Sequence, residues 1–462
     1  MVDIPEVAKL RAEVLREDWV PKSAYISNEF AELERGRLWP RVWQVACREE
    51  DIPNVGSYYT YNILDDSIIV IRTARDTIKA FNNACRHRGR TLVSGHGSLT
   101  GFFCKFHGWT YNLDGQNTKV LDKEDWRGCL KDEELRLVEF RTGVWGGWVF
   151  VNMDPDAESL EDFLGEVPRY LNCLELEKLR YRWYVSLEVP ANWKTTQEAF
   201  AESYHTATTH PSLPPYMDDR SISKEIGKHT RLSFVAEKDY TPGYRFGGLK
   251  SAGVRESALE LIRQAARDIH SVSGDRDYQA ASRILRELPE DATYTEALAK
   301  ANQFIREAAI ASGAGYPAIT PEQARELGMD WVIFPNMIGV PTPTCGLWYR
   351  SRPIPDNDPN RCIFEIYSLE RFAPGTEPKI ERKHYSDWRD FKEMPPFLRP
   401  DFVNIPEVQK GMRTRGHRAT RTSPVQERAI WNFHRVLREY LFDDERNPKP
   451  EAVPFPKAQV GR

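Results

Sequence analysis

Long hydrophobic runs are absent from this 462-residue sequence, which has no stretch of about 18 apolar residues that could span a membrane as a helix. Charge is nearly balanced, because the formal net charge is only −4, so neither nucleic acid nor an anionic membrane surface is indicated as a partner. The first residues, MVDIPEVAKLRAEV, lack the apolar core of a signal peptide. We therefore expect a cytoplasmic protein that binds neither membrane nor nucleic acid.

Cysteine is scarce as well. Seven cysteines are scattered along the chain, and this odd number has no spacing typical of a disulfide framework. In a reducing compartment, cysteines that cluster are more often metal ligands than disulfide partners. The hydrophobic content of 40% and the charged content of 29% are typical of globular proteins, and the length favours two or three domains.

The first part of the chain divides into a helical segment and a β-rich region. Residues 1–40 have apolar residues near helical spacing, which predicts an N-terminal helical segment that packs on the last domain of the chain. From residue 41 to 155, short β-like runs such as SYYTYNI and GVWGGWVFVNM are separated by Pro, Gly and Asn or Asp turns. This pattern predicts a small all-β domain.

Residues 156–462 predict a second domain of the α+β class. Residues 179–189 and three runs within 331–371 have strand-like patterns, and residues 427–442 form an amphipathic helix. Antiparallel strands followed by a long helix favour a sheet that wraps around that helix, with an apolar cavity between them. Residues from about 250 to 325 have helical periodicity and form a predicted insertion, which is either a packing subdomain or a lid over a substrate channel.

Two Cys/His pairs lie in the predicted all-β domain. Cys85 and His87 occur in CRHRGR, and Cys104 and His107 occur in CKFHGW. A zinc site and an iron–sulfur cluster are the two alternatives. A structural zinc finger usually supplies its cysteine pair and its histidine pair separately, whereas each loop here offers one thiolate and one imidazole. This arrangement suits a two-iron cluster in which one iron binds both sulfurs and the other binds both nitrogens.

A second candidate metal site lies in residues 192–211, NWKTTQEAFAESYHTATTHP. His205 and His210 follow two carboxylates, Glu198 and Glu202, and on a continuous α-helix Glu198, Glu202 and His205 would share one stripe. Two imidazoles and a carboxylate that leave coordination positions open are typical of a non-haem Fe(II) site that activates dioxygen. The alternative is a surface helix with two incidental histidines.

The two motifs, in this order, resemble those of one family. CRHRGR and CKFHGW resemble the loops of Rieske 2Fe-2S domains, and NWK…E…ESYH…H resembles the mononuclear-iron motif of Rieske non-haem iron oxygenases. That family includes the α subunits, or terminal oxygenases, of aromatic-ring-hydroxylating dioxygenases. The resemblance extends from about residue 30 to 441 and is weakest from 215 to 330. It implies an N-terminal Rieske domain and a helix-grip catalytic domain.

The resemblance also implies roles for individual residues. The third ligand of the mononuclear iron would be Asp401, which precedes Gln409-Lys410-Gly411, beside His205 and His210. Glu202 would link that iron site to a cluster histidine of a neighbouring subunit, where the family usually carries Asp. Carboxylates that compete for the third ligand position are Asp387, Asp390 and Glu407.

The function implied by the resemblance is hydroxylation of an aromatic or other small organic substrate with O2. Electrons would come from NAD(P)H through a flavin reductase, with or without a ferredoxin, because this sequence has no dinucleotide-binding fingerprint. A homotrimer is implied, alone or with a β subunit. Two features favour an alternative, a monooxygenase or demethylase of a non-aromatic substrate such as a quaternary amine: Glu202 replaces Asp, and Ala199 stands where many dioxygenases have Asn. A Rieske electron carrier without oxygenase activity is a third alternative.

Overall fold

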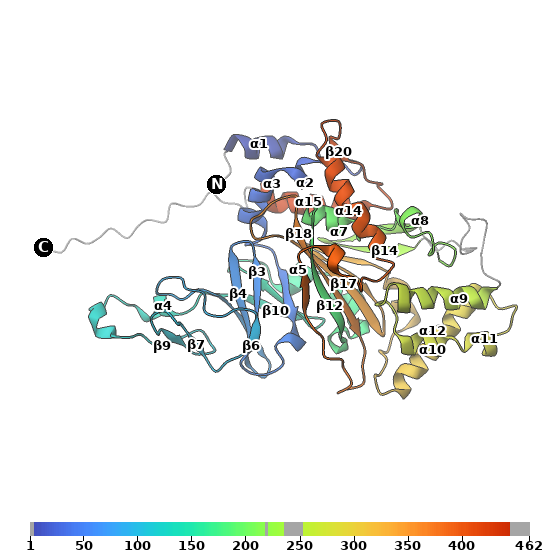
Figure 1. Ribbon diagram of the computed structural model, residues 1–462, viewed down its shortest axis with the longest axis horizontal. Helices are drawn as coiled ribbons and strands as arrows, with labels where there is room; N and C mark the ends of the chain where they lie inside the picture. The colour runs from blue at the N-terminus through green and yellow to red at the C-terminus, as the bar shows by residue number, and fades with distance from the viewer. Residues whose placement is uncertain (1–3, 218–219, 235–252, 444–462) are drawn as a thin grey trace.

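The computed structural model describes residues 4–217, 220–234 and 253–443, so the predicted N-terminal segment and insertion are seen from residues 4 and 253 onward. A β-rich region lies at one end of the long axis, a large sheet lies in the centre, and a group of helices lies at the other end (Figure 1). Among the described residues, no helix has both the length and the apolar character needed to cross a bilayer.

The β-rich region is built on a seven-stranded antiparallel sheet. Its strand order is β2-β11-β10-β5-β4-β3-β6. Strands β7 to β9 form a separate three-stranded sheet, and a short helix, α4, follows it. The bounds are β2 (Gln44–Arg48), β3 (Ser57–Ile63), β4 (Asp66–Ala74), β5 (Thr77–Asn82), β6 (His96–Ser98), β7 (Phe102–Phe103), β8 (Thr110–Tyr111), β9 (Asn117–Lys119), α4 (Asp132–Leu135), β10 (Glu139–Trp145) and β11 (Trp148–Asn152).

The central sheet has eight strands in the order β13-β14-β15-β16-β17-β18-β12-β19. All neighbours are antiparallel except β12 and β19, which run parallel. The bounds are β12 (Arg180–Val189), β13 (Ser221–Ile226), β14 (His229–Phe234), β15 (Trp331–Ile333), β16 (Met337–Pro341), β17 (Cys345–Pro353), β18 (Cys362–Glu370) and β19 (Lys383–Tyr385).

A long C-terminal helix, α15 (Arg428–Phe442), packs against β13 and β14. Its buried residues include Ile430, Phe433 and Leu437, which recur at helical spacing and form one apolar face. The predicted fold class is therefore confirmed: an N-terminal β domain precedes a mixed α+β domain with an antiparallel sheet and covering helices.

The insertion lies between β14 and β15. Its helices are α9 (Val254–Arg263), which continues as a π-helical turn to Asp268, α10 (Asp275–Ala281), α11 (Ile284–Glu287) and α12 (Tyr294–Ala311), and α13 (Pro321–Glu326) follows. These helices enclose a hydrophobic cluster of their own, which includes Ala258, Ala281, Ala301 and Phe304. Because this hydrophobic cluster is separate from the main core, the insertion is a small helical subdomain added to the sheet.

The N-terminal segment is broken into short elements. They are α1 (Ile4–Ala12), β1 (Val20–Pro21), α2 (Ser23–Ile26) and α3 (Asn28–Leu33), which continues as a π-helical turn from Glu34 to Leu38. This turn contacts α15, and β1 pairs with β20 (Ala419–Thr420). The remaining helices are α5 (Leu160–Leu164), α6 (Val167–Leu171), α7 (Trp193–Glu198), α8 (Thr206–Thr209) and α14 (Arg399–Met412).

The prediction that Glu198, Glu202 and His205 share one stripe of a continuous helix is wrong. Helix α7 ends at Glu198, and α8 begins only at Thr206. The carboxylate of Glu202 accepts hydrogen bonds from the backbone N–H groups of Tyr204 and His205, and such local side-chain bonds compete with helical ones. Glu198 and Glu202 therefore do not share a stripe.

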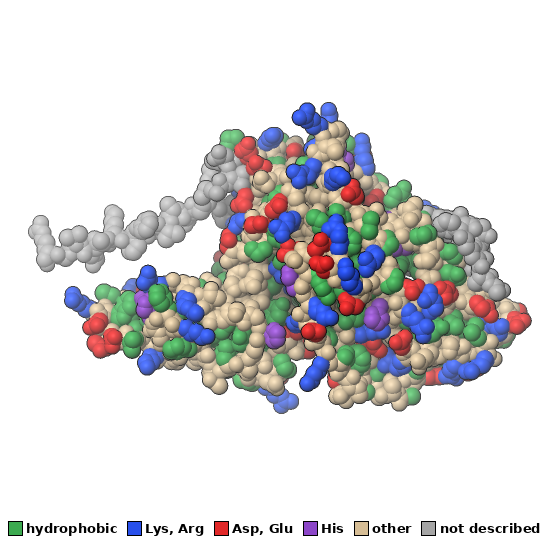
Figure 2. Space-filling view, viewed as in Figure 1, with side chains coloured by type: hydrophobic (Ala, Val, Ile, Leu, Met, Phe, Trp, Pro, Cys, Tyr) green, Lys and Arg blue, Asp and Glu red, His purple; other side chains and the backbone are tan. Residues whose placement is uncertain are grey.

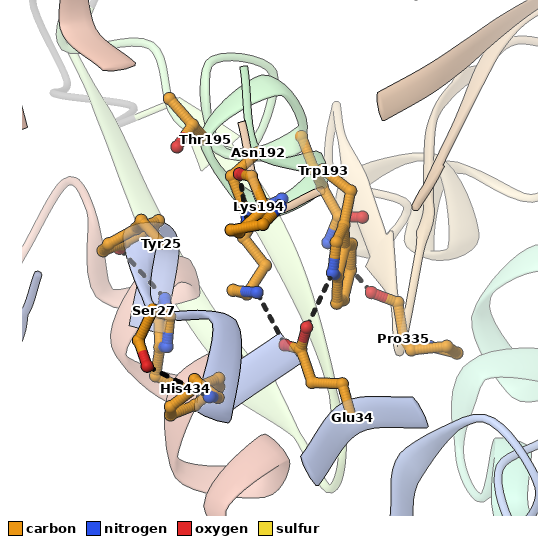
Figure 3. A network of polar contacts seen from close by, with 12 residues as sticks. Tyr25, Ser27, Glu34, Asn192, Trp193, Lys194, Thr195, Pro335 and His434 are labelled. Atoms are coloured by element: carbon orange, nitrogen blue, oxygen red, sulfur yellow. Dashed lines mark hydrogen bonds and ion pairs between the residues drawn. The ribbon is translucent and has the colours of Figure 1, made fainter. Parts of the chain in front are cut away.

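A buried polar network holds α7 in place (Figure 3). Lys194 Nζ lies 2.6 Å from Glu34 Oε1, and Trp193 Nε1 donates to Glu34 Oε2 at 3.1 Å. Burial raises the pKa of Glu34 and lowers that of Lys194, and each charge partly offsets this effect on the other. Glu198 accepts a hydrogen bond from the Tyr25 hydroxyl at 2.8 Å and pairs with His434 of α15 at 2.7 Å. Helix α7 is thus held by the N-terminal segment and by α15.

Candidate metal centres and active-site cavity

Two loops with the same backbone geometry carry the Cys/His pairs. In the first loop, Gly89 donates its N–H to the carbonyl of Cys85 at 2.9 Å, and in the second loop Gly108 donates to Cys104 at 2.9 Å. Both glycines have positive φ, 73° and 70°, a conformation that side chains disfavour. Each loop closes through a second bond from its cysteine N–H, to Arg90 and to Trp109 respectively. The two loops therefore present their side chains in the same way.

The donor atoms of the two loops fit a bound cluster. The His87 and His107 rings are 4.5 Å apart between centroids, and the Nδ1 atom of each is buried without a hydrogen-bond partner. Two buried, unpaired ring nitrogens beside two buried cysteines are costly unless something binds them. The two cysteines and two histidines of these loops match the ligand types of a Rieske 2Fe-2S cluster.

Neighbouring groups tune this site. Although burial opposes ionisation, the backbone N–H groups of Phe106 and His107 lower the pKa of the Cys104 thiol. The Trp109 ring stacks on His87 with centroids 5.0 Å apart and fixes its orientation. The Tyr111 hydroxyl lies 3.3 Å from the Cys85 sulfur, a contact that the sequence analysis missed because nothing in a tyrosine seven residues beyond Cys104 signals it.

The second metal site is assembled from two distant segments. His210 Nε2 lies 3.0 Å from Asp401 Oδ1, and His205 Nε2 lies 3.6 Å from the same oxygen. Donor atoms of these three residues all lie within 4.8 Å of one another. The rings point their nitrogens at a common space, and the Phe397 ring stacks on His210 with centroids 3.9 Å apart. Two imidazoles and one carboxylate suit Fe(II) with open positions.

Glu202 supports the site from outside. Its Oε1 lies 2.6 Å from His205 Nδ1, so this ring turns Nε2 toward Asp401. Although burial favours neutral imidazole, the hydrogen bond that His205 donates to Glu202 raises the pKa of His205. Tyr204, two residues beyond Glu202, is 58% exposed, so Glu202 lies close to the molecular surface.

Helix α14 positions Asp401 in its first turn. Further along that helix, the Gln409 side chain accepts hydrogen bonds from the Asn192 N–H at 3.1 Å and from the Thr195 hydroxyl at 2.9 Å. Gln409 therefore fixes α14 to the start of α7, a role that the sequence did not reveal. The competing carboxylates lie elsewhere: Asp387 pairs with Arg389, and Asp390 and Glu407 are exposed.

A cavity of about 710 Å³ opens at His205, His210 and Asp401. Aromatic side chains surround the metal site, including Phe200 and Phe397. The opposite wall comes from the inserted helices, through the apolar side chains of Leu261, Ile262, Ala265, Leu298 and Ile305. The insertion is thus both a helical subdomain with its own core and a wall of the cavity. Neither of the two sequence-based interpretations, a packing subdomain or a lid, is therefore sufficient alone.

The two candidate metal sites lie on opposite sides of the central sheet. Strands β7 and β9, beside the Cys/His loops, are at one end of the long axis, and α8, between His205 and His210, lies beyond the sheet (Figure 1). Exposed side chains surround the Cys/His loops: Phe103 and Phe106 are 58% and 55% exposed. Figure 2 shows a histidine at this end among hydrophobic, lysine and arginine side chains.

Comparison with known families and proteins extends this picture. The family described as "Ring hydroxylating alpha subunit (catalytic domain)" matches residues 176–443, and the "Rieske [2Fe-2S] domain" matches residues 42–127. The carnitine monooxygenase oxygenase subunit of Escherichia coli K12 is 31% identical over 202 residues, which are 43% of this chain and 54% of that protein. The anthranilate 1,2-dioxygenase large subunit of Acinetobacter baylyi is 32% identical over 200 residues, 41% and 42% of the two chains.

The matched region spans about half the length of these curated relatives. Among solved structures, the quaternary ammonium Rieske monooxygenase CntA in complex with L-carnitine has a TM-score of 0.62 at 19% identity and covers 93% of this chain and 99% of its own. Naphthalene 1,2-dioxygenase from Rhodococcus sp. has a TM-score of 0.60 at 19% identity, with coverages of 96% and 99%. At these identities the structural likeness shows a shared fold.

Proposed function

Because the chain belongs to the ring-hydroxylating α-subunit family and carries a Rieske 2Fe-2S domain, we propose that it is the terminal oxygenase of a multicomponent system. One observation carries this proposal: a single chain holds a Cys/His site for a two-iron cluster and a His/His/Asp site that opens into a large cavity. When bound, the cluster supplies single electrons and the mononuclear iron activates O2. An electron carrier would have no use for the second site.

The side chains support the reaction by position. We propose His205, His210 and Asp401 as the ligands of the mononuclear iron and Cys85, His87, Cys104 and His107 as those of the cluster. The cavity walls exclude water and hold a substrate carbon next to the iron. Electrons are supplied by NAD(P)H through a flavin reductase, with or without a ferredoxin.

We further propose monooxygenation of an amine substrate. One oxygen atom enters a C–H bond next to nitrogen and the other leaves as water, which consumes two electrons and two protons. The resulting carbinolamine breaks its C–N bond to give an amine and an aldehyde. Glu202 and Ala199 support this choice, as do the relatives that act on carnitine and on glycine betaine in Escherichia coli and Pseudomonas aeruginosa. The relatives therefore favour the amine alternative over aromatic hydroxylation, the first interpretation of the sequence.

Assembly follows from the separation of the two sites. An electron that leaves the cluster must cross most of the molecule to reach the iron of the same chain (Figure 1). A head-to-tail ring places the cluster of one chain beside Glu202 of the next, and closure with three copies gives a trimer. We propose that Glu202 connects His205 to the partner's cluster histidine, in a homotrimer with or without a β subunit.

Mixed trimers test this arrangement. Cys104→Ser chains lack a cluster and Asp401→Ala chains lack the mononuclear iron, so each variant alone should have no activity. Co-expression should restore part of the activity, because an intact cluster in one chain then faces an intact iron in its neighbour. Glu202→Gln, which keeps both metal sites, should slow turnover in the same assay. Absence of any recovery in mixed trimers would contradict transfer between chains.

Labelled oxygen tests the reaction type. With a surrogate reductase and a panel of amines and arenes, monooxygenation should place one labelled atom in the product and one in water. Two labelled atoms in one arene product would show that aromatic dihydroxylation is the correct assignment.

A further inference from the structure

The charge of the active-site cavity is one-sided. Among the described residues that line it there is no lysine or arginine, whereas four carboxylates face it: Glu202, Asp277, Asp330 and Asp401. A cavity without a basic side chain offers no counter-ion to an anionic substrate. Its own carboxylates attract cations, and this attraction is strong where water is excluded.

Three of these carboxylates are already engaged. Glu202 holds His205, and Asp401 faces both histidines of the candidate iron site. Asp277 is fully buried, accepts a hydrogen bond from the Thr344 hydroxyl at 2.6 Å and lies 3.0 Å from the guanidinium of Arg276.

Asp330 is the exception. Its carboxylate makes no hydrogen bond or ion pair with any residue that the structure describes, although its backbone is firmly held. The Asp330 carbonyl accepts the N–H of Leu232 at 2.8 Å, and the N–H of Met329 donates to the Leu232 carbonyl at 2.8 Å. Asp330 therefore projects from a rigid position directly before β15, and its side chain faces the cavity. The Asp330 side chain is partly exposed to the cavity, where a ligand or water can satisfy its carboxylate.

Asp330 lines the same cavity as His205, His210 and Asp401. Burial raises its pKa to about 7, and the nearby His205 acts in the opposite direction. The buried Tyr349 hydroxyl lies within electrostatic range of both Asp401 and Asp330. The Phe200 ring packs on Tyr349 with centroids 4.4 Å apart, and both rings line the same cavity as the carboxylate. A carboxylate next to aromatic rings is a favourable environment for an alkylated ammonium group.

We propose that Asp330 is the residue that recognises the positively charged nitrogen of the substrate, with the apolar remainder of the substrate extending toward α9 and α12. Asp330 and His205 line the same cavity, so a cation held at Asp330 brings the carbons attached to nitrogen toward the metal site. The wall formed by the inserted helices is largely apolar, and a cavity of about 710 Å³ has room for a substituent larger than a methyl group. This inference deepens the proposed amine oxidation and depends on it for the claim that the bound cation is the substrate.

A binding experiment without turnover separates the two proposals. The iron-loaded protein, without reductase, is titrated calorimetrically with (4-hydroxybenzyl)trimethylammonium and with 4-neopentylphenol, its neutral carbon isostere. Asp330→Asn keeps the size of the side chain and removes its charge. It should weaken binding of the cation by about 10- to 100-fold, which is the effect of losing a charged partner in a buried site, and leave the phenol within about threefold.

A matched control tests position rather than total charge. Asn302 lies on α12 in the same cavity, so Asn302→Asp in the Asp330→Asn background restores a carboxylate at the opposite wall. It should not restore cation binding. Three results would each overturn the proposal. They are equal binding of the cation by wild type and Asp330→Asn, an equal loss of affinity for both ligands in Asp330→Asn, and binding of the phenol by wild type that is tighter than its binding of the cation. The labelled-oxygen test of oxygenase activity is independent of all three results.

Discussion

The cluster site and the mononuclear iron site are built in opposite ways. All four proposed cluster ligands lie between residues 85 and 107, on two loops with the same hydrogen bonds. The iron site joins His210 to a carboxylate 191 residues away, through contacts among α7, α14 and the N-terminal segment. The first site depends on local backbone geometry and the second on the packing of the whole catalytic domain. Substitutions can separate these two kinds of dependence.

The largest effect is expected for Cys104→Ser, which removes a ligand from the local site. The variant should lose the visible absorption of the cluster and all steady-state turnover, while His205, His210 and Asp401 still bind iron. Absorption spectra and iron analysis measure both results. Cys129→Ser is the matched control, because Cys129 is an exposed cysteine of the same region. Loss of both metals in Cys104→Ser would show that the two sites depend on each other.

Asp401→Ala should produce the reverse pattern, with an intact cluster spectrum and no turnover. The two histidines alone hold divalent iron weakly, so the mononuclear iron should be lost on dialysis. Glu407→Gln changes an exposed carboxylate on the same helix and should behave like wild type. Full activity of Asp401→Ala would show that another carboxylate, such as one of the competing ones, is the third iron ligand.

The buried pair of Lys194 and Glu34 tests how far the iron site depends on distant packing. Lys194→Met leaves the Glu34 carboxylate without its cation in the interior, which should cost about 3–5 kcal/mol of unfolding free energy. Because α7 leads into the segment that carries His205 and His210, iron at the mononuclear site should fall while the cluster spectrum persists. Chemical denaturation and metal analysis provide the measurements. The double variant Lys194→Met/Glu34→Leu should recover much of the stability, and no recovery would contradict the role of the pair.

The smallest effect concerns acid stability of the catalytic sheet. His229 Nε2–H donates to the Phe163 carbonyl at 2.7 Å, and its Nδ1 accepts from the Phe334 N–H at 3.1 Å, so the buried ring is neutral. Burial lowers its pKa to about 4. Between that value and the ordinary one of about 6.5, the unfolded chain binds a proton that the folded chain does not. Unfolding free energy should therefore fall by about 3 kcal/mol as pH decreases from 6.5 to 4.

His229→Gln should flatten this part of the stability profile, measured by denaturant titrations at several pH values. His96→Gln, at an exposed histidine of the β-rich region, should leave it unchanged. An identical slope in wild type and His229→Gln would assign the acid sensitivity to other groups.

The sequence predicted most of what is local. The Cys/His spacing indicated the cluster, and the predicted C-terminal helix 427–442 agrees with α15 (Arg428–Phe442). Helical periodicity also located the insertion, because its apolar residues repeat at helical spacing along a continuous stretch of sequence.

The sequence failed where tertiary contacts decide. The spacing of Glu198, Glu202 and His205 is that of a helix. However, the Glu202 carboxylate accepts hydrogen bonds from N–H groups that would otherwise continue this helix. Asp401 was predicted as a ligand only through resemblance, since no spacing connects it to His210. Asp330 gave no signal, because its position in the cavity without a hydrogen-bond or ion-pair partner among the described residues exists only in the folded protein.

The helices between β14 and β15 enclose a hydrophobic centre of their own and still form one side of the reaction chamber. A protein organised in this way has an exchangeable cassette. Replacing residues 254–311 would alter which molecules enter the cavity and would leave the residues of the two metal sites unchanged. Changes in substrate specificity would then be made in the inserted helices, while the loops that carry the metal sites stayed the same.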